Sequence, residues 1–171
     1  MRFTILFLVC VLYSSLLFGA ENELPALAVL AFKYEGITEV QSILLRDDLG
    51  YELEKSGVVR VIERERLDDL LKEQGLQLTD SVDTESAIDI GKLAGANYVV
   101  LGTVGIFSSS SNSFLGTETE DYYLAVVRVV DVESGDIVAS SRVKEDMHNF
   151  DEIAEHLSKE LVKGLSQLVQ K

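Results

Sequence analysis

Apolar residues recur along the chain in two patterns, one typical of buried strands and the other of amphipathic helices. A continuous apolar run covers residues 26–32, and a nearly continuous one, interrupted by Arg60, covers residues 58–62. Their length predicts strands that are covered on both faces. Only Glu63 and Arg64 separate the second strand from a predicted helix, so the strand passes into the helix without a loop. The helical stripe has spacings of three and four residues and consists of Leu67, Leu70, Leu71 and Gln74.

The segment between these two strands predicts a helix with defined ends. Thr38 and Gln41 have the spacing of a capping box, which satisfies free amides at a helix start. Lys55 suits the negative end of the helix dipole, and Gly57 can adopt the left-handed conformation that ends a helix. Strand, helix and strand in this order form a βαβ unit, which implies parallel pairing and a right-handed crossover. Two apolar faces are expected on the helix, one of Leu45, Leu49 and Leu53 and the other of Val40, Leu44 and Tyr51.

The second half of the chain predicts a short helix, three more strands and a final helix. Thr84 is placed to cap the short helix, and Gly95 to end it. Strands are expected at residues 97–106, 122–132 and 137–143, and the last two form an antiparallel hairpin. The final helix has a capping start at Asn149 and Glu152 and one apolar stripe of Ile153, Leu157, Leu161, Leu165 and Leu168.

Residues 107–121 differ in composition from the rest of the chain. A serine run is followed by Phe114 and Leu115 and then by threonine and glutamate. The absence of apolar alternation predicts a mobile loop with two exposed apolar residues at its tip. Residues 108–120 are therefore a candidate contact surface, and the alternative is a disordered hairpin tip that contacts nothing.

The element order, β-α-β-α-α-β-β-β-α, predicts a single α/β domain with a mixed parallel and antiparallel sheet and helices packed on it. This domain is expected at residues 21–171, because residues 1–20 have the order of a signal peptide. An uncleaved membrane anchor is the alternative for that segment. Cys10 lies inside the apolar run, so lipidation there would leave a leader that is too short, and we do not expect it.

The charge of the chain excludes several classes of partner. Lys and Arg number 15 against 29 Asp and Glu, which gives a net charge of −14. Such acidity argues against nucleic acid and against adhesion to anionic lipid. The first strand-to-helix link contains a single glycine, Gly36, so it lacks the clustered glycines of a nucleotide site. We expect no small-molecule substrate.

Candidate catalytic and metal-binding groups are sparse. His156 lies with Glu152 and Glu155 at the start of the last helix, which is more typical of a solvated helix face than of a metal site. The serines occur in the polar run and not at a strand-to-helix elbow. We therefore predict no catalytic residue, no cofactor and no metal. Arg60, a lone charge in an apolar strand, is expected at a sheet edge or an interface.

Three blocks occur in a characteristic order at residues 59–74, 95–104 and 128–137. The first is similar to V-x-V-hydrophobic-E-R-x-x-L-x-x-L-L-x-E, and the second to A-N-x-hydrophobic-hydrophobic-x-G-x-hydrophobic. The third is similar to R-V-V-D/N-V-x-S/T-G-E/D-I. In this order and spacing they resemble the curli-secretion family, the periplasmic portion of CsgG-type outer-membrane secretion channels. The resemblance covers most of residues 26–145.

The resemblance implies an α/β domain in the periplasm or at the periplasmic face of the outer membrane, without catalytic residues. Related periplasmic proteins of this fold include activators of peptidoglycan synthases. Pore-forming members carry two long membrane hairpins, but the corresponding links here, residues 107–121 and 144–150, are too short for such strands. The chain therefore resembles the soluble periplasmic domain without the membrane hairpins.

These observations predict a non-enzymatic exported envelope protein that acts by protein–protein contact, as an assembly or secretion accessory. The alternatives are an activator or regulator of a cell-envelope enzyme, a subunit of an outer-membrane secretion complex, and an enzyme or ligand-binding domain. Envelope proteins and a second copy of the chain are the expected partners. The candidate contact residues are Phe114, Leu115, Arg60, Arg64 and Arg66.

Overall fold

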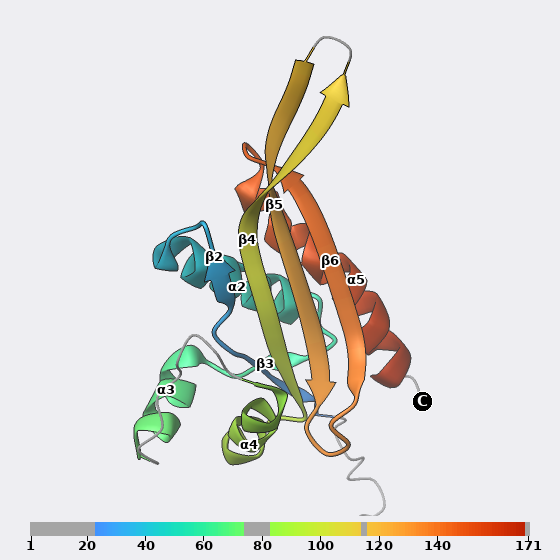
Figure 1. The fold of residues 1–171 in the computed structure, drawn as a ribbon. Helices are drawn as coiled ribbons and strands as arrows, with labels where there is room; N and C mark the ends of the chain where they lie inside the picture. The colour runs from blue at the N-terminus through green and yellow to red at the C-terminus, as the bar shows by residue number, and fades with distance from the viewer. Residues whose placement is uncertain (1–22, 74–82, 114–115, 170–171) are drawn as a thin grey trace, which may run out of the picture.

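Six strands and four α-helices form over the residues that the computed structural model describes, 23–73, 83–113 and 116–169 (Figure 1). The strands are β1 (Ala26–Val29), β2 (Lys33–Glu35), β3 (Arg60–Val61), β4 (Tyr98–Ser113), β5 (Gly116–Asp131) and β6 (Ile137–Asp146). The helices are α2 (Glu39–Lys55), α3 (Arg64–Glu73), α4 (Thr84–Ala94) and α5 (Ile153–Val169), and a 3-10 turn, η1 (Phe150–Glu152), precedes α5.

The strands form one mixed sheet whose main order is β3-β1-β4-β5-β6. β1 pairs in parallel with both β3 and β4, which confirms the predicted βαβ unit. β4, β5 and β6 pair antiparallel, which confirms the predicted hairpin and the mixed α/β class. The link between the first apolar run and α2 contains a strand that the sequence did not predict, because β2 pairs in parallel with β4. Its three residues are mostly exposed and give no apolar signal.

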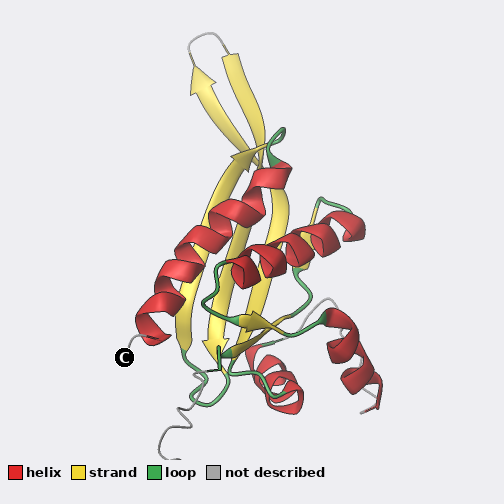
Figure 2. Ribbon diagram, turned by 180° about the vertical axis from the view of Figure 1, so that it is seen from behind, coloured by secondary structure: helices red, strands yellow, loops and turns green. Residues whose placement is uncertain are grey.

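Helices α2 and α5 cover one face of the sheet (Figure 2). Their predicted core stripes are buried against it, and neither Leu49 nor Leu161 is exposed at all. The second apolar face of α2 points away from this core: Val40, Leu44 and Tyr51 remain 64%, 52% and 65% exposed. Across the described residues, no helix combines the length and apolar character needed to cross a membrane.

Helices α3 and α4 cover the other face of the sheet only at the end where β1 and β3 lie. Leu67 and Leu71 from α3 and Ile90 from α4 form a second, smaller core there with Leu30 and Val99. In the part of the chain that the structure describes, no helix lies over the rest of this face, along β4, β5 and β6 (Figure 1).

The helix ends follow the sequence at most positions. The capping box of α2 is confirmed: Thr38 N donates to Gln41 Oε1 at 2.9 Å, and Gln41 N donates to Thr38 Oγ1 at 3.2 Å. Gly95 ends α4 with φ of 68°, as predicted. Two predicted caps are wrong. Asp83, not Thr84, caps α4, and Asn149 makes no side-chain cap bond because η1 forms there instead.

β4 and β5 continue beyond the end of the sheet as a two-stranded hairpin, so the loop predicted at residues 107–121 is wrong over the described residues. The strands pair at every position out to Ser113 and Gly116. Polar side chains also pair across the strands, because Ser108 Oγ donates to Asp121 Oδ1 at 2.6 Å. A backbone ladder with polar cross-strand pairs therefore forms this segment without an apolar face. Phe114 and Leu115 lie outside the described residues.

Candidate functional site

The face of β4, β5 and β6 that points away from α2 and α5 is the candidate functional surface, and we call it the open face. Successive residues of a strand point to opposite faces, and Tyr123, Ala125 and Val127 of β5 are buried in the core with α2 and α5. Their neighbours on β5 and the residues paired with those neighbours therefore belong to the open face. Its chemistry is set by Lys33, Phe107, Tyr122, Leu124, Val126, Arg128, Arg142 and Lys144.

Four exposed cations gather on the open face. Lys33 pairs with Thr103, Thr103 with Val126 and Val126 with Arg142, so one rung across four strands has a cation at each end. Arg128 lies two residues from Val126 on β5, and Lys144 lies two residues from Arg142 on β6. Within the described residues, none of the four cations forms an ion pair. Asp146, which is paired with Tyr122, is an exposed carboxylate on the same face. The cations outnumber it, so the face is locally basic on a strongly acidic protein.

An aromatic pair lies on the open face where the hairpin leaves the sheet. The rings of Phe107 and Tyr122 stack with centroids 6.4 Å apart. The Nζ of Lys144 lies 3.9 Å from the centroid of the Tyr122 ring, within the range of a cation–π contact. Phe107 and Val126 each remain 36% exposed. The open face thus presents aromatic area beside positive charge, a combination that is enriched in protein–protein interfaces.

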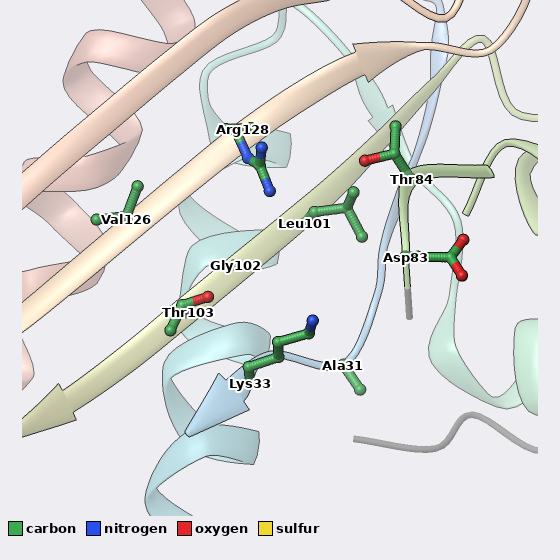
Figure 3. A pocket seen from close by; sticks show the side chains of 9 residues that line it. All are labelled: Ala31, Lys33, Asp83, Thr84, Leu101, Gly102, Thr103, Val126 and Arg128. Carbon is green, nitrogen blue, oxygen red and sulfur yellow. The ribbon is translucent and has the colours of Figure 1, made fainter. Parts of the chain in front are cut away.

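A cavity of about 420 Å³ opens at the other end of the open face, between β2, β4, β5 and the start of α4 (Figure 3). Lys33 and Arg128 reach toward it from opposite sides of β4, and the hydroxyl of Thr103 also lines it. Asp83 lies at the edge of the cavity, but its Oδ1 accepts from Ser86 N at 2.8 Å. This hydrogen bond lowers the pKa of Asp83 below its ordinary value of 3.8. The cavity therefore combines two cations with one carboxylate that already caps a helix.

The three arginines predicted as contacts lie near the β3 edge of the sheet and not on the open face. Arg60 is exposed on the edge strand itself, which confirms the expectation of an edge residue. Arg60 and Arg66 line a hollow of about 550 Å³ together with Glu54. Arg64 differs, because its guanidinium lies 3.4 Å from Asp68 and 3.9 Å from a second carboxylate on α2. A binding role for these arginines stays a prediction.

Side chains of the metal-ligand type meet between β6 and the start of α5. Glu145, Glu152 and His156 place their ligand atoms within 4.8 Å of one another, so these residues could hold a divalent cation. The sequence grouped His156 with Glu152 and Glu155, and Glu152 does lie in this cluster. Glu155 instead pairs with Lys159, and Glu145 reaches His156 from β6. His156 Nδ1 lies 2.5 Å from Glu145 Oε1, and this hydrogen bond joins the strand to the helix.

The sequence contains part of the signal for the open face but does not predict it. Arg142 and Lys144 occur two residues apart in one predicted strand, and Tyr122, Val126 and Arg128 occur at even spacing in the other. Such spacing assigns each set to one face of its strand. Which face remains uncovered depends on where the helices pack, and the strand sequences alone do not specify this.

Comparison with known families supports this fold independently. The family described as curli production assembly/transport component CsgG matches residues 31–159. The chain belongs to the CsgG family. This match confirms the resemblance carried by residues 59–74, 95–104 and 128–137. It also includes every open-face residue of this CsgG-family chain. No sequence among the curated proteins matches it.

Solved structures with the same fold share little sequence with this CsgG-family chain. The LpoB C-terminal domain from Escherichia coli aligns with a TM-score of 0.54 at 17% identity, over 78% of this chain and 92% of that domain. Lipoprotein GNA1162 from Neisseria meningitidis aligns with a TM-score of 0.53 at 15% identity, over 86% of this chain and 99% of that one. At these identities the likeness shows the fold.

Proposed function

We propose that the protein is an exported, non-enzymatic component of the cell envelope that acts by protein–protein contact, as an assembly or secretion accessory. Membership of a family described as an assembly and transport component supports this role. The location that we propose is the periplasm or the periplasmic face of the outer membrane, with residues 1–20 as the export signal and residues 21–171 as one domain.

The open face is the observation that carries this proposal. It is a sheet surface whose backbone is fixed by continuous pairing of β4, β5 and β6. It presents the Phe107 and Tyr122 rings together with exposed cations. Rigid aromatic and arginine side chains are the residue types that most often dominate the free energy of protein–protein binding. The tip residues Phe114 and Leu115 adjoin this surface in sequence and belong to the proposed contact region.

Site-specific photo-crosslinking in the host cell tests the proposal. A photoreactive amino acid at Val126 lies on the open face, and one at Glu160 lies on the solvent side of α5 as the matched control. We expect a discrete envelope protein to be captured from position 126 and not from position 160. Capture from position 160 alone, or from neither position, would contradict a contact through the open face.

The alternative role is regulation of a cell-envelope enzyme, which the fold shared with the LpoB C-terminal domain makes relevant. The same crosslinking experiment separates the two roles, because the captured partner is identified by mass spectrometry. An accessory role predicts that the captured partner is a secretion or assembly component. Substitutions on the open face should then lower the amount of that component's substrate at the cell surface. A regulatory role predicts an enzyme whose turnover changes when the purified protein is added.

A further inference from the structure

Within the described residues, the four cations of the open face form no ion pair, which is also true of Arg60, Arg66 and Lys163. Asp83 lines the same cavity as Lys33 and interacts with it electrostatically, but its carboxylate already caps α4. Ion pairs satisfy Arg46, Lys55, Arg64, Lys72, Lys92 and Lys159 on the helices. In the described part of the chain, no carboxylate pairs with the four cations Lys33, Arg128, Arg142 and Lys144. We refer to these four residues as the cationic set. Carboxylates outnumber cations almost two to one in this chain. Four cations without an ion pair on one face therefore form a surface that can bind an anion from another molecule.

The sheet register makes Arg128 and Arg142 of the cationic set neighbours on one face. Arg142 is paired with Val126, and Arg128 follows Val126 on the same face, so Arg128 and Arg142 are diagonal neighbours. Diagonal neighbours of a sheet lie about 7–8 Å apart between α-carbons. Like charges at this spacing repel each other, and an anion bound between them would relieve the repulsion. Lys33 and Arg128 lie on the two strands that flank β4, and both side chains line the cavity (Figure 3).

The surroundings of the cationic set favour a polypeptide over a phosphate polymer or a lipid surface. Tyr122 carries Lys144 over its ring and stacks on Phe107, so apolar area interrupts the charge. The net charge of −14 opposes approach to a nucleic acid backbone or to an anionic bilayer, both of which extend far beyond four cations. A short segment with a few carboxylates and apolar side chains matches both parts of the face.

We infer that the cationic set is a binding site for an acidic, aromatic- or leucine-containing segment of a partner polypeptide. One carboxylate side chain of the segment enters the cavity between Lys33 and Arg128, and Arg128 can bind it through two parallel hydrogen bonds. Its apolar side chains lie on Phe107 and Tyr122. The inference rests on the proposed function and specifies the kind of partner that the open face accepts.

Binding of a defined peptide to the full chain tests this inference. The probe is a fluorescently labelled glutamate-rich peptide that carries phenylalanine, followed by fluorescence anisotropy. We expect binding that weakens as salt is raised, because charge pairs on a surface are screened. The double variant Arg128→Glu with Arg142→Glu should weaken binding about tenfold or more. Both side chains are exposed, so the fold should survive, and a circular dichroism melt checks it.

The matched control is Lys159→Glu with Lys163→Glu, which changes the net charge equally but lies on exposed positions of α5. This control should keep most of the binding. Equal loss in both double variants would overturn the inference, because net charge alone would then explain it. Binding of phosphatidylglycerol vesicles or of duplex DNA in place of the peptide would also overturn it. If the peptide does not bind but crosslinking at Val126 still captures a protein, the inference fails and the proposed function stands.

Discussion

Gly164 of α5 lies directly against Ala139 of β6. A Cβ atom at Gly164 would be 2.8 Å from the Cβ of Ala139, which is closer than two carbon atoms pack. Two small residues therefore allow the helix to approach the strand here. A larger side chain at either position would clash with the other residue. The same helix presents buried Leu161 and Leu165 to the core on either side of this contact.

We expect Gly164→Ala to lower the free energy of unfolding by about 1–2 kcal/mol, because overpacking outweighs the gain in helix propensity. Ala139→Gly removes the opposing methyl group, so the double variant should lose less stability than the two single variants combined. Urea unfolding of all four proteins measures the difference. Strictly additive losses would show that the two residues do not share a tight contact.

Gly91 and Gly50 are both buried helical glycines, but their surroundings predict opposite effects of alanine. A Cβ at Gly91 would lie 2.7 Å from methyl groups of Val99 and Val132, whereas a Cβ at Gly50 would lie 3.8 Å from its nearest neighbour. Gly91→Ala should destabilise the protein by about 1–3 kcal/mol. Gly50→Ala should stabilise it by roughly 0.5–1 kcal/mol through helix propensity. Thermal unfolding checks both, and a shift of the same sign for both would contradict the packing.

Asp47 links α2 to the start of α3 through two arginines. Its Oδ1 accepts from Nε and Nη2 of Arg46 at 2.9 and 2.7 Å, and its Oδ2 lies 3.9 Å from Arg64. The side chain of Arg46 is only 7% exposed, so Asp47→Ala leaves a buried guanidinium without its anion. We expect a loss of about 1.5–3 kcal/mol in the free energy of unfolding.

Asp48 is the matched control for this prediction, because it is exposed beside Asp47 and forms no ion pair within the described residues. Asp48→Ala should change the free energy of unfolding by no more than about 0.5 kcal/mol. Guanidinium unfolding compares the two variants with the native chain. Equal losses would mean that Asp47 acts through general charge and not through Arg46.

Asp83, at the start of α4, should make the stability of the fold depend on pH in the acid range. The amide of Ser86 donates to its carboxylate and lowers the pKa of Asp83 below 3.8. A group with a lowered pKa stabilises the fold above its ordinary pKa, and this contribution is lost as pH falls through the lowered value. Asp83→Asn keeps a capping oxygen but cannot titrate. Its urea midpoint should therefore fall less than that of the native chain between about pH 6 and about pH 3.

An Asp83→Ala variant completes the comparison, because it lacks both the capping oxygen and the charge. It should be less stable than Asp83→Asn at neutral pH, and its stability should also depend less on acid than that of the native chain. Identical pH profiles for the native chain and Asp83→Asn would exclude a contribution from this carboxylate.

The helical stripes were the most predictable part of this fold. Leu45, Leu49 and Leu53 of α2 repeat every four residues, and all three are buried as predicted. The capping box at Thr38 fixed the start of the same helix. Such signals are local, because one helix turn brings the interacting residues together. The parallel pairing of β1 with β3 followed from the short connections alone, and it is confirmed.

The errors lie where pairing between distant segments decides the structure. β2 forms because Lys33 and its neighbours meet β4 some seventy residues later. The outer parts of β4 and β5 pair although their sequence is polar, because they continue the ladder of the inner parts of the same two strands. The open face depends on where the described helices pack, because α2 and α5 lie on the opposite side of the sheet and α3 and α4 cover only one end of this side. None of these features has a local apolar pattern that a strand or helix period could reveal.

The parallel pairing of β1 with the first residues of β4 places β1 at one end of the long strand β4 and the hairpin at the other end. Leu27 lies beside Tyr98, whereas the last hairpin pair, Ser113 and Gly116, lies at the far end of the same strand. Sixteen extended residues of β4 span roughly 50 Å. A tether on the N-terminal side of β1 would therefore hold the tip at that distance from its attachment point. Removing two facing residues from each strand of the hairpin would shorten this distance by roughly 7 Å. The number of residues in β4 and β5 therefore sets how far the hairpin extends.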